Sequence, residues 1–226
     1  MARNGNDKLI EKLEGCFSEK NIKKYLDKTN ADYRYLEPGR FLYKMTMKFN
    51  YKEKFGDDFL ELAYITLKAW GMNSQSATLV KYPDFKSKIR KVKKHFDKLK
   101  NERIEDFEKN NYSEELGNIF LNLKLSETQS QLVTVSKLMH FILPHLIVPI
   151  DRKYTLNFFN KNNQNTFADI DKQFSVFINI EKAYSMFLKE NELKKYKDRD
   201  WNQNIPKILD NLVIGYMLKQ KESKEA

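Results

Sequence analysis

The chain has 226 residues, of which 41% are hydrophobic and 13% aromatic, and its formal net charge is +10. This composition argues against a disordered chain, and the length allows one sizeable core or two small lobes that share it. Seven glycines and five prolines leave few turns, which favours helices over a many-turned β protein. The single cysteine, Cys16, excludes a disulfide within the chain and fits a reducing, cytoplasmic location.

The charge pattern indicates what the protein contacts. The first twenty residues are charged throughout and no run approaches 18 apolar residues, so we expect no secretory signal and no membrane partner. Residues 81–100 hold nine lysines or arginines against two acids, a local excess of nine minus two, or +7. Such an asymmetry is typical of a surface that meets phosphates, so we expect a cytoplasmic monomer that binds DNA.

The apolar pattern is helical along most of the first half. The exception is residues 41–49, where apolar side chains occupy every second position and indicate a short extended segment. A helix is predicted from Asp57, with acids in its first turn, to Gly71, a residue typical of helix ends. Residues 85–100 predict a basic helix with one apolar stripe, formed by Phe85, Ile89, Val92, Phe96 and Leu99.

Five further helices are predicted in the second half. One starts at Ser113, and another runs from about 127 to 143 behind a capping-box pattern, Ser126 followed by Gln129. Asp151 opens the next helix, and two more end the chain, the last capped by Asn204. We expect one compact multi-helix domain over residues 1–226. The alternative is two lobes, 57–135 and 136–219, with a cleft between them.

Two charged residues within SKLMHFILPHLIVPIDRKYTLNFF, residues 136–159, need a chemical explanation. Thr134, Lys137 and His140 follow one another at intervals of three inside an otherwise apolar helix. A lysine on a buried helix must extend to the surface, find a partner or act as an amine of lowered basicity. Asp151 either only caps the next helix, which contributes about 1 kcal/mol, or also carries charge-stabilising chemistry. The pattern leaves both interpretations open.

A helix with a lysine, an apolar stretch and then "VPID" opening the next helix resembles the helix-hairpin-helix DNA glycosylases. In that superfamily such a segment supplies the catalytic aspartate, and some members carry a lysine one helix earlier. The resemblance therefore implies Asp151 and Lys137 as catalytic residues. The stretch TLKAWGMNSQSATL resembles the early helix and turn whose polar residue fills the gap left by a flipped base, which implies Asn73 and Gln75. The other residues that we expect nearest the pocket are Trp70, His140, Tyr154 and Trp201.

The chain also departs from the superfamily pattern. VTVSK, at 133–137, stands where the superfamily has a phosphate-binding hairpin, and Val133 and Val135 replace its glycines. The interval from lysine to aspartate is about one turn shorter than usual. The archaeal 8-oxoguanine glycosylases, which have a degenerate hairpin, are the branch that the chain resembles, over roughly residues 57–219. SKLMHFILPHLIVPIDRKYT and PKILDN also resemble an uncharacterised bacterial family, which implies no function.

The resemblance implies an enzyme that flips a damaged or modified base out of double-stranded DNA and excises it, without cofactor or metal. An oxidised or alkylated base would indicate DNA repair, and a hypermodified viral base would indicate phage defence. Two alternatives stay open. One is a non-enzymatic DNA-binding protein that uses the basic helix 85–100, and the other is a protein-interaction subunit with solvated lysines. The residues expected to contact the DNA backbone are Lys88, Arg90, Lys91 and Lys94.

Overall fold

The computed structural model describes residues 5–35, 39–52, 55–73, 77–110 and 112–225. Within these ranges the chain is mainly helical, as predicted, and β structure is limited to an antiparallel bridge between Leu79 and Ser126. The α-helices are α1 (Gly5–Cys16), α2 (Glu19–Thr29), α3 (Arg40–Lys52), α4 (Asp57–Ala69), α5 (Tyr82–Lys91), α6 (Lys93–Leu99), α7 (Ser113–Leu123), α8 (Leu132–Ile142), α9 (Gln164–Phe167), α10 (Ile170–Glu190) and α11 (Ile205–Glu225). Short turns of 3-10 or π type are η1 (Asn30–Arg34), η2 (Ile104–Asp106), η3 (Arg152–Leu156) and η4 (Lys194–Tyr196).

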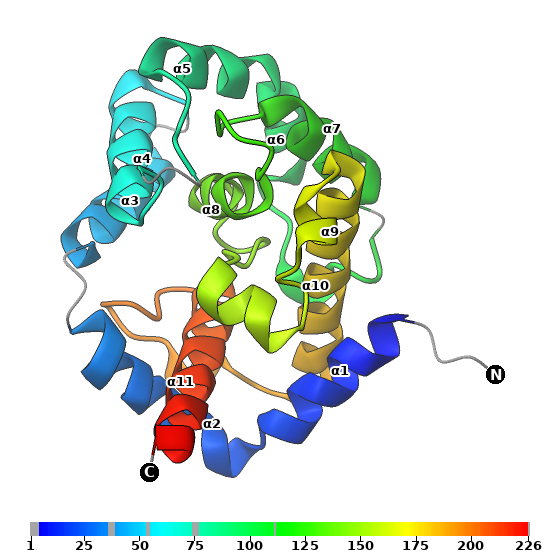
Figure 1. Ribbon diagram of the computed structural model, residues 1–226. Coiled ribbons are helices and arrows are strands. Elements are labelled where there is room, and N and C mark those ends of the chain that lie inside the picture. The colour runs from blue at the N-terminus through cyan, green and yellow to red at the C-terminus, as the bar shows by residue number, and fades with distance from the viewer. Residues whose placement is uncertain (1–4, 36–38, 53–54, 74–76, 111, 226) are drawn as a thin grey trace.

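Helix α8 lies at the centre of the fold (Figure 1). It contacts α3, α4 and α10, while α2 packs along α11 and α1 packs along α10. Every residue of α8 from Leu132 to Ile142 is buried, as expected for a helix that is apolar on nearly all sides. Helices α3 to α7 lie on one side of α8, and α1, α2 and α11 lie on the other. The division into lobes 57–135 and 136–219 stays a prediction.

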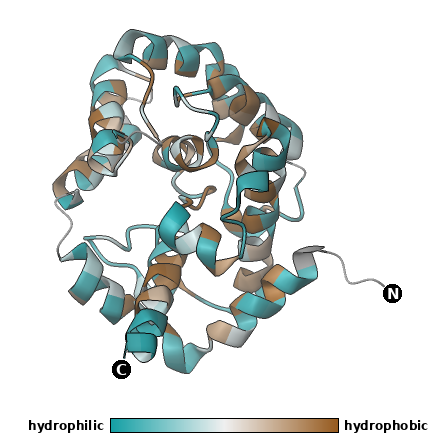
Figure 2. Ribbon diagram, in the orientation of Figure 1, coloured by the Kyte–Doolittle hydropathy of each residue, from teal (hydrophilic) through white to brown (hydrophobic). Residues whose placement is uncertain are grey.

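The outer surfaces of the helices are hydrophilic and their inner faces apolar (Figure 2). On α5 and α6 all five residues of the predicted apolar stripe are buried, so the lysines and arginines take the outer positions. None of the helices in the described ranges is both long and apolar enough to cross a membrane.

The extended segment predicted at 41–49 is wrong, because these residues belong to α3. Tyr43, Thr46, Met47 and Asn50 are buried, and these positions recur at the three- and four-residue spacing of a helix face. Phe41, which the alternating pattern also assigned to the buried side, is 69% exposed. Met and Lys are weak strand formers, so the helical period prevails over the alternation.

Other helix boundaries are shifted from those predicted. The basic helix is divided at Val92 into α5 and α6, and α8 begins at Leu132 because residues 127–130 lie outside it. The capping box predicted at Ser126 is therefore wrong. The end of α4 is confirmed: Gly71 has φ +87° there, a conformation that favours glycine. Asn204 also caps α11 as predicted, since its side-chain oxygen accepts a hydrogen bond from the Lys207 amide at 2.9 Å.

A close approach of α11 to α2 predicts a position that is sensitive to added volume. A Cβ atom on Gly215 of α11 would lie 1.9 Å from the Tyr25 carbonyl oxygen of α2. We expect Gly215→Ala to lower the free energy of unfolding by about 1–3 kcal/mol or more, measured by urea denaturation. The control is Gly15→Ala, where a Cβ meets nothing within 4 Å and the helix gains roughly 0.5–1 kcal/mol. Equal stability of the two variants would contradict this packing.

Candidate active site

The segment from Ile147 to Asp151 is held in place by buried side chains of α8 and α10. The His140 ring bonds the Ile147 carbonyl at 2.7 Å, and the Ser136 hydroxyl accepts the Ile150 amide at 3.1 Å. Both Glu181 carboxyl oxygens lie 3.2 Å from the Val148 amide nitrogen. Pro149 has no amide hydrogen, so every backbone donor from 148 to 150 is accounted for. The chain is thereby fixed just before Asp151.

His140 takes part in this network as a neutral ring. Burial, together with the positive charge of Lys207, lowers the pKa of His140 to about 3. Since its Nδ1 faces a carbonyl, Nδ1 carries the proton and Nε2 accepts a hydrogen bond from the Tyr43 hydroxyl at 3.0 Å. The residue does not line the cavity described below. It positions the loop instead.

Asp151 lies at the N-terminus of η3 and uses its two oxygens differently. Oδ1 accepts the backbone amides of Lys153 at 2.7 Å and Tyr154 at 3.2 Å, so Asp151 is the helix cap that the sequence predicts. Oδ2 lies 3.5 Å from the Lys137 ammonium nitrogen. The cap fixes the carboxylate, and the second oxygen is directed towards the lysine. The two interpretations of Asp151 are therefore compatible in one geometry.

Lys137 reaches Asp151 from the buried face of α8. Its side chain is 8% exposed, and its nitrogen donates to the Trp70 carbonyl at the end of α4 at 3.3 Å. Both contacts are long for charge-assisted hydrogen bonds, which are typically about 2.7–2.9 Å. The amine is therefore placed by two weak contacts, an arrangement that allows it to turn towards a ligand.

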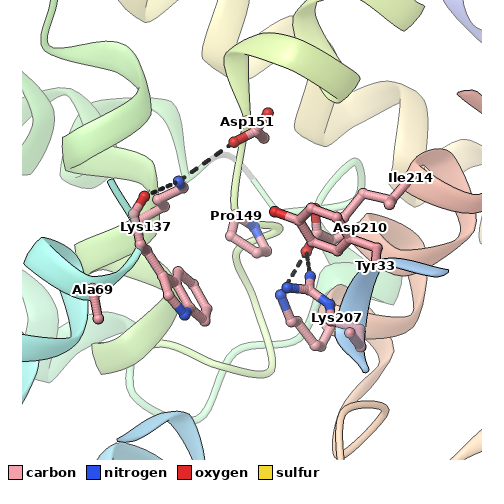
Figure 3. Close-up of a pocket in the computed structure, with 10 residues that line it drawn as sticks. Tyr33, Ala69, Lys137, Pro149, Asp151, Lys207, Asp210 and Ile214 are labelled. Carbon is pink, nitrogen blue, oxygen red and sulfur yellow. Dashed lines mark hydrogen bonds and ion pairs between the residues drawn. The ribbon is translucent and has the colours of Figure 1, made fainter. Parts of the chain in front are cut away.

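A second charged group, formed by residues of α11 and η1, faces this pair (Figure 3). Lys207 Nζ lies 2.6 Å from Asp210 Oδ2, and the Arg34 guanidinium lies 3.0 Å from the same oxygen. The side chains of all three are at most 5% exposed. Arg34 also donates twice to the Asn211 side-chain oxygen. Arg34, Lys207 and Asp210 form one wall of the site, and this wall is rigid because each ion is paired and the carboxylate is bonded twice.

The two charged groups and Trp70 enclose a cavity of about 160 Å³ (Figure 3). Pro149 lies between the Lys137–Asp151 side and the Lys207–Asp210 side. Trp70 lies within cation–π distance of both lysines, since Lys137 Nζ is 5.8 Å and Lys207 Nζ is 4.6 Å from its ring centroid. A cavity of roughly 150 Å³ admits a benzene ring, so this one admits a ligand of about one ring. The lining is completed by Tyr33, Arg34, Ala69 and Ile214.

The other predicted pocket residues lie around this cavity or apart from it. Tyr154 is buried and packs edge-on against Tyr33, which lines the cavity, at 5.3 Å between ring centroids. Asn73 is exposed in the turn after α4, three residues beyond Trp70, and Gln75 lies outside the described residues. Trp201 is buried and stacks on Tyr43. The side chains of Tyr154, Asn73 and Trp201 do not line the cavity itself.

The predicted phosphate contacts lie on α5 and α6, away from the cavity lining. Lys91 and Lys94 are exposed and Lys88 is half-buried, whereas Arg90 is paired with Asp57 at 2.8 Å. The N-terminus of α8, where the superfamily resemblance placed a phosphate-binding hairpin, is occupied by protein. Its amides at Gln131 and Leu132 donate to the buried Gln173 side-chain oxygen at 2.8 and 2.9 Å.

Sequence reasoning missed Arg34, Lys207 and Asp210. Lys207 and Asp210 lie three residues apart on α11 among Ile208, Leu209 and other buried residues. A lysine in an apolar helix was the feature that singled out Lys137, and the same signal is present at Lys207. Arg34 lies in a polar segment far from α11 in the sequence, and no pattern links the two.

Comparisons with protein-family models, with curated proteins and with solved structures found no match to the chain.

The Glu181 carboxyl predicts a pH dependence of stability. Burial raises its pKa well above the ordinary value, so the folded protein keeps the proton to a higher pH than the unfolded chain, which releases it above about pH 4.5. Stability from this group is therefore present at pH 4 and is lost as pH rises. We expect Glu181→Gln, which is neutral at every pH, to raise the Tm relative to wild type at pH 8 and not at pH 4.

Replacing the carboxyl by an apolar side chain should lower the stability instead. Glu181→Leu leaves the Val148 amide without an acceptor, which costs about 1–3 kcal/mol in urea unfolding. A gain in Glu181→Gln that is the same at both pH values would mean that Glu181 is not held protonated.

Proposed function

We propose that this chain is a DNA N-glycosylase that excises a damaged or modified base and leaves an abasic site. The observation that carries the proposal is the position of Asp151. One of its oxygens is bonded by two helix amides, and the other lies 3.5 Å from a buried lysine at the edge of a ring-sized cavity. A cap alone would need only the first oxygen. The orientation of the second favours chemistry over a structural role.

The electrostatics of the site suit the loss of a base from a sugar. As the bond between C1′ and the base nitrogen breaks, its electron pair leaves with the base and positive charge develops on the sugar. A carboxylate fixed by the protein stabilises that charge without reorganising, because its hydrogen bonds are already formed. Asp151 meets this requirement through the amides of Lys153 and Tyr154.

Two nucleophiles can complete the reaction at C1′. In the first route water adds to C1′ as the bond to the base breaks, and the proton that water gives to Asp151 passes on to the departing base, which leaves neutral. In the second route the Lys137 ammonium first gives a proton to Asp151 and then adds as a neutral amine, forming a bond from Nζ to C1′. The base takes up the proton that the amine gives up, and ring opening then yields a Schiff base that permits strand scission. The second route fits an amine that is placed by two long contacts.

The cavity is small enough to select a base and exclude the rest of a nucleotide. An enzyme that acts on a base in duplex DNA extrudes it into a pocket and reads it there by stacking and hydrogen bonding. Trp70 supplies an aromatic surface, and the wall of Arg34, Lys207 and Asp210 supplies fixed polar groups. The exposed lysines of α5 and α6 supply the charge for backbone contacts, which give affinity without sequence choice.

A non-enzymatic DNA-binding protein is the second candidate. The observation that favours it is the capping geometry itself, since the two amide bonds to Oδ1 explain an aspartate at this position without any chemistry. In that case Lys137 only neutralises the second oxygen. The two candidates differ in base release, and substitution of Asp151 separates them.

Asp151→Asn is the decisive variant, because Asn caps a helix about as well as Asp. We expect the Tm to change by only a few degrees while abasic-site formation disappears. The assay exposes genomic DNAs that carry different damaged or modified bases to the protein and measures abasic sites. Lys137→Gln should bind DNA and lose any adduct that borohydride traps between wild-type protein and DNA. The matched control is Lys153→Gln, which removes an exposed lysine two residues after Asp151 and should leave base release unchanged.

The pattern of losses distinguishes the routes. Loss in both variants together with a trapped adduct indicates the amine route, and loss in Asp151→Asn without an adduct in wild type indicates the water route. If wild type releases no base from any DNA in the panel while binding it, the non-enzymatic candidate replaces this proposal.

A further inference from the structure

Two exposed aromatic side chains lie beside the active site and are unexplained by the fold. Tyr35 is 82% exposed and Phe41 is 69% exposed. Among the described residues, the remaining large hydrophobic side chain with such exposure is Ile65, at 45%, on α4. A single exposed hydrophobic residue needs no explanation, but Tyr35 and Phe41 line the same hollow.

This hollow, which we call the aromatic hollow, has a volume of about 620 Å³. Tyr35, Phe41 and Trp201 line it together with Arg34 and Arg40. Arg34 also lines the active-site cavity, so the two spaces share a wall. Its guanidinium lies 4.5 Å from the Trp201 ring centroid. A pocket of roughly 300–1,000 Å³ accommodates a whole small ligand, so the hollow admits more than one ring.

The two carboxylates of the hollow are engaged by the protein's own donors. Asp200 is paired with Lys44 and with Arg40, which lies 3.6 Å from it. Asp198 accepts the backbone amides of Asp200 at 2.7 Å and Asn202 at 2.9 Å. The Arg40 side chain is nevertheless 58% exposed. A ligand entering the hollow therefore meets exposed rings and an exposed cation rather than unpaired acids.

We propose that the aromatic hollow binds unpaired nucleotides that flank the base held in the active-site cavity. Stacking on exposed aromatic side chains, with arginine beside them, is how proteins hold single-stranded nucleic acid without sequence preference. Tyr35 and Phe41 stack on the bases, and Arg40 contacts a phosphate. The inference rests on the proposed function in that DNA is the partner. It adds that the substrate is engaged with its strands locally separated over more than the excised base.

The test measures whether binding depends on the bases themselves. The full chain is titrated into a fluorescent oligothymidylate of about ten nucleotides, a length within the range of single-strand sites. A second oligomer of the same length carries abasic tetrahydrofuran units, so it keeps the phosphates and lacks the rings. We expect tighter binding of the oligothymidylate. The Tyr35→Ala/Phe41→Ala variant should weaken that binding about fivefold or more per ring and leave binding of the abasic oligomer unchanged.

Two control variants separate stacking from other effects. Ile65→Ala removes an exposed hydrophobic side chain outside the hollow and should bind both oligomers like wild type. A variant with Lys88, Lys91 and Lys94 changed to Glu should weaken the binding of both oligomers alike, because it reverses charge away from the hollow and leaves the exposed rings in place.

Three results would overturn the inference. Wild type could bind both oligomers equally, the double variant could behave like wild type, or sedimentation could show a wild-type dimer that the double variant abolishes. The last result would make the hollow a contact between two copies of the chain.

Base release is measured in parallel. If base release is absent while binding depends on the rings, the proposed function alone is removed. Base release that disappears in Asp151→Asn, without ring-dependent binding, removes this inference alone.

Discussion

The whole candidate site depends on the hydrogen bonding of one short loop. The carbonyl of Ile147 and the amides of Val148 and Ile150 are bonded by side chains that are themselves fully buried. Because the loop cannot shift without breaking these bonds, Asp151 enters η3 at a fixed angle. One carboxylate oxygen then accepts hydrogen bonds from the helix amides, and the other lies 3.5 Å from the Lys137 nitrogen. A structural constraint thereby creates a chemical pair.

Burying these charged groups lowers the stability of the fold. Lys137 and Lys207 are buried in helices among apolar residues, and burial raises the pKa of the Glu181 carboxyl. A buried ion pair is often no more stabilising than well-packed hydrophobic residues. These groups converge on one cavity, directly or through the loop, instead of being scattered through the core. Perturbed and buried polar groups gathered around a cavity are a mark of function.

The sequence predicted the helical class, and it singled out Lys137 because a charge inside an apolar helix has few physical explanations. Asp151 was joined to it only through the superfamily resemblance. The sequence could not predict the second charged group of the cavity, formed by Arg34, Lys207 and Asp210. Lys207 and Asp210 stand at the spacing of an ordinary surface ion pair, and only the packing of α11 against α2 shows that they are buried. The helix at 41–49 was misread because Tyr43 and Met47 are four residues apart, which satisfies both the period of a strand and that of a helix.

The central claim is that Asp151 and Lys137 act as a unit on one ligand, and a double-mutant cycle tests it most directly. The rate of base release is measured in single turnovers for Asp151→Asn, Lys137→Gln and the double variant. Residues that serve the same step are strongly non-additive, so we predict that the double variant is no slower than the slower single variant. Losses that multiply, or a wild-type protein that releases no base, would contradict the account.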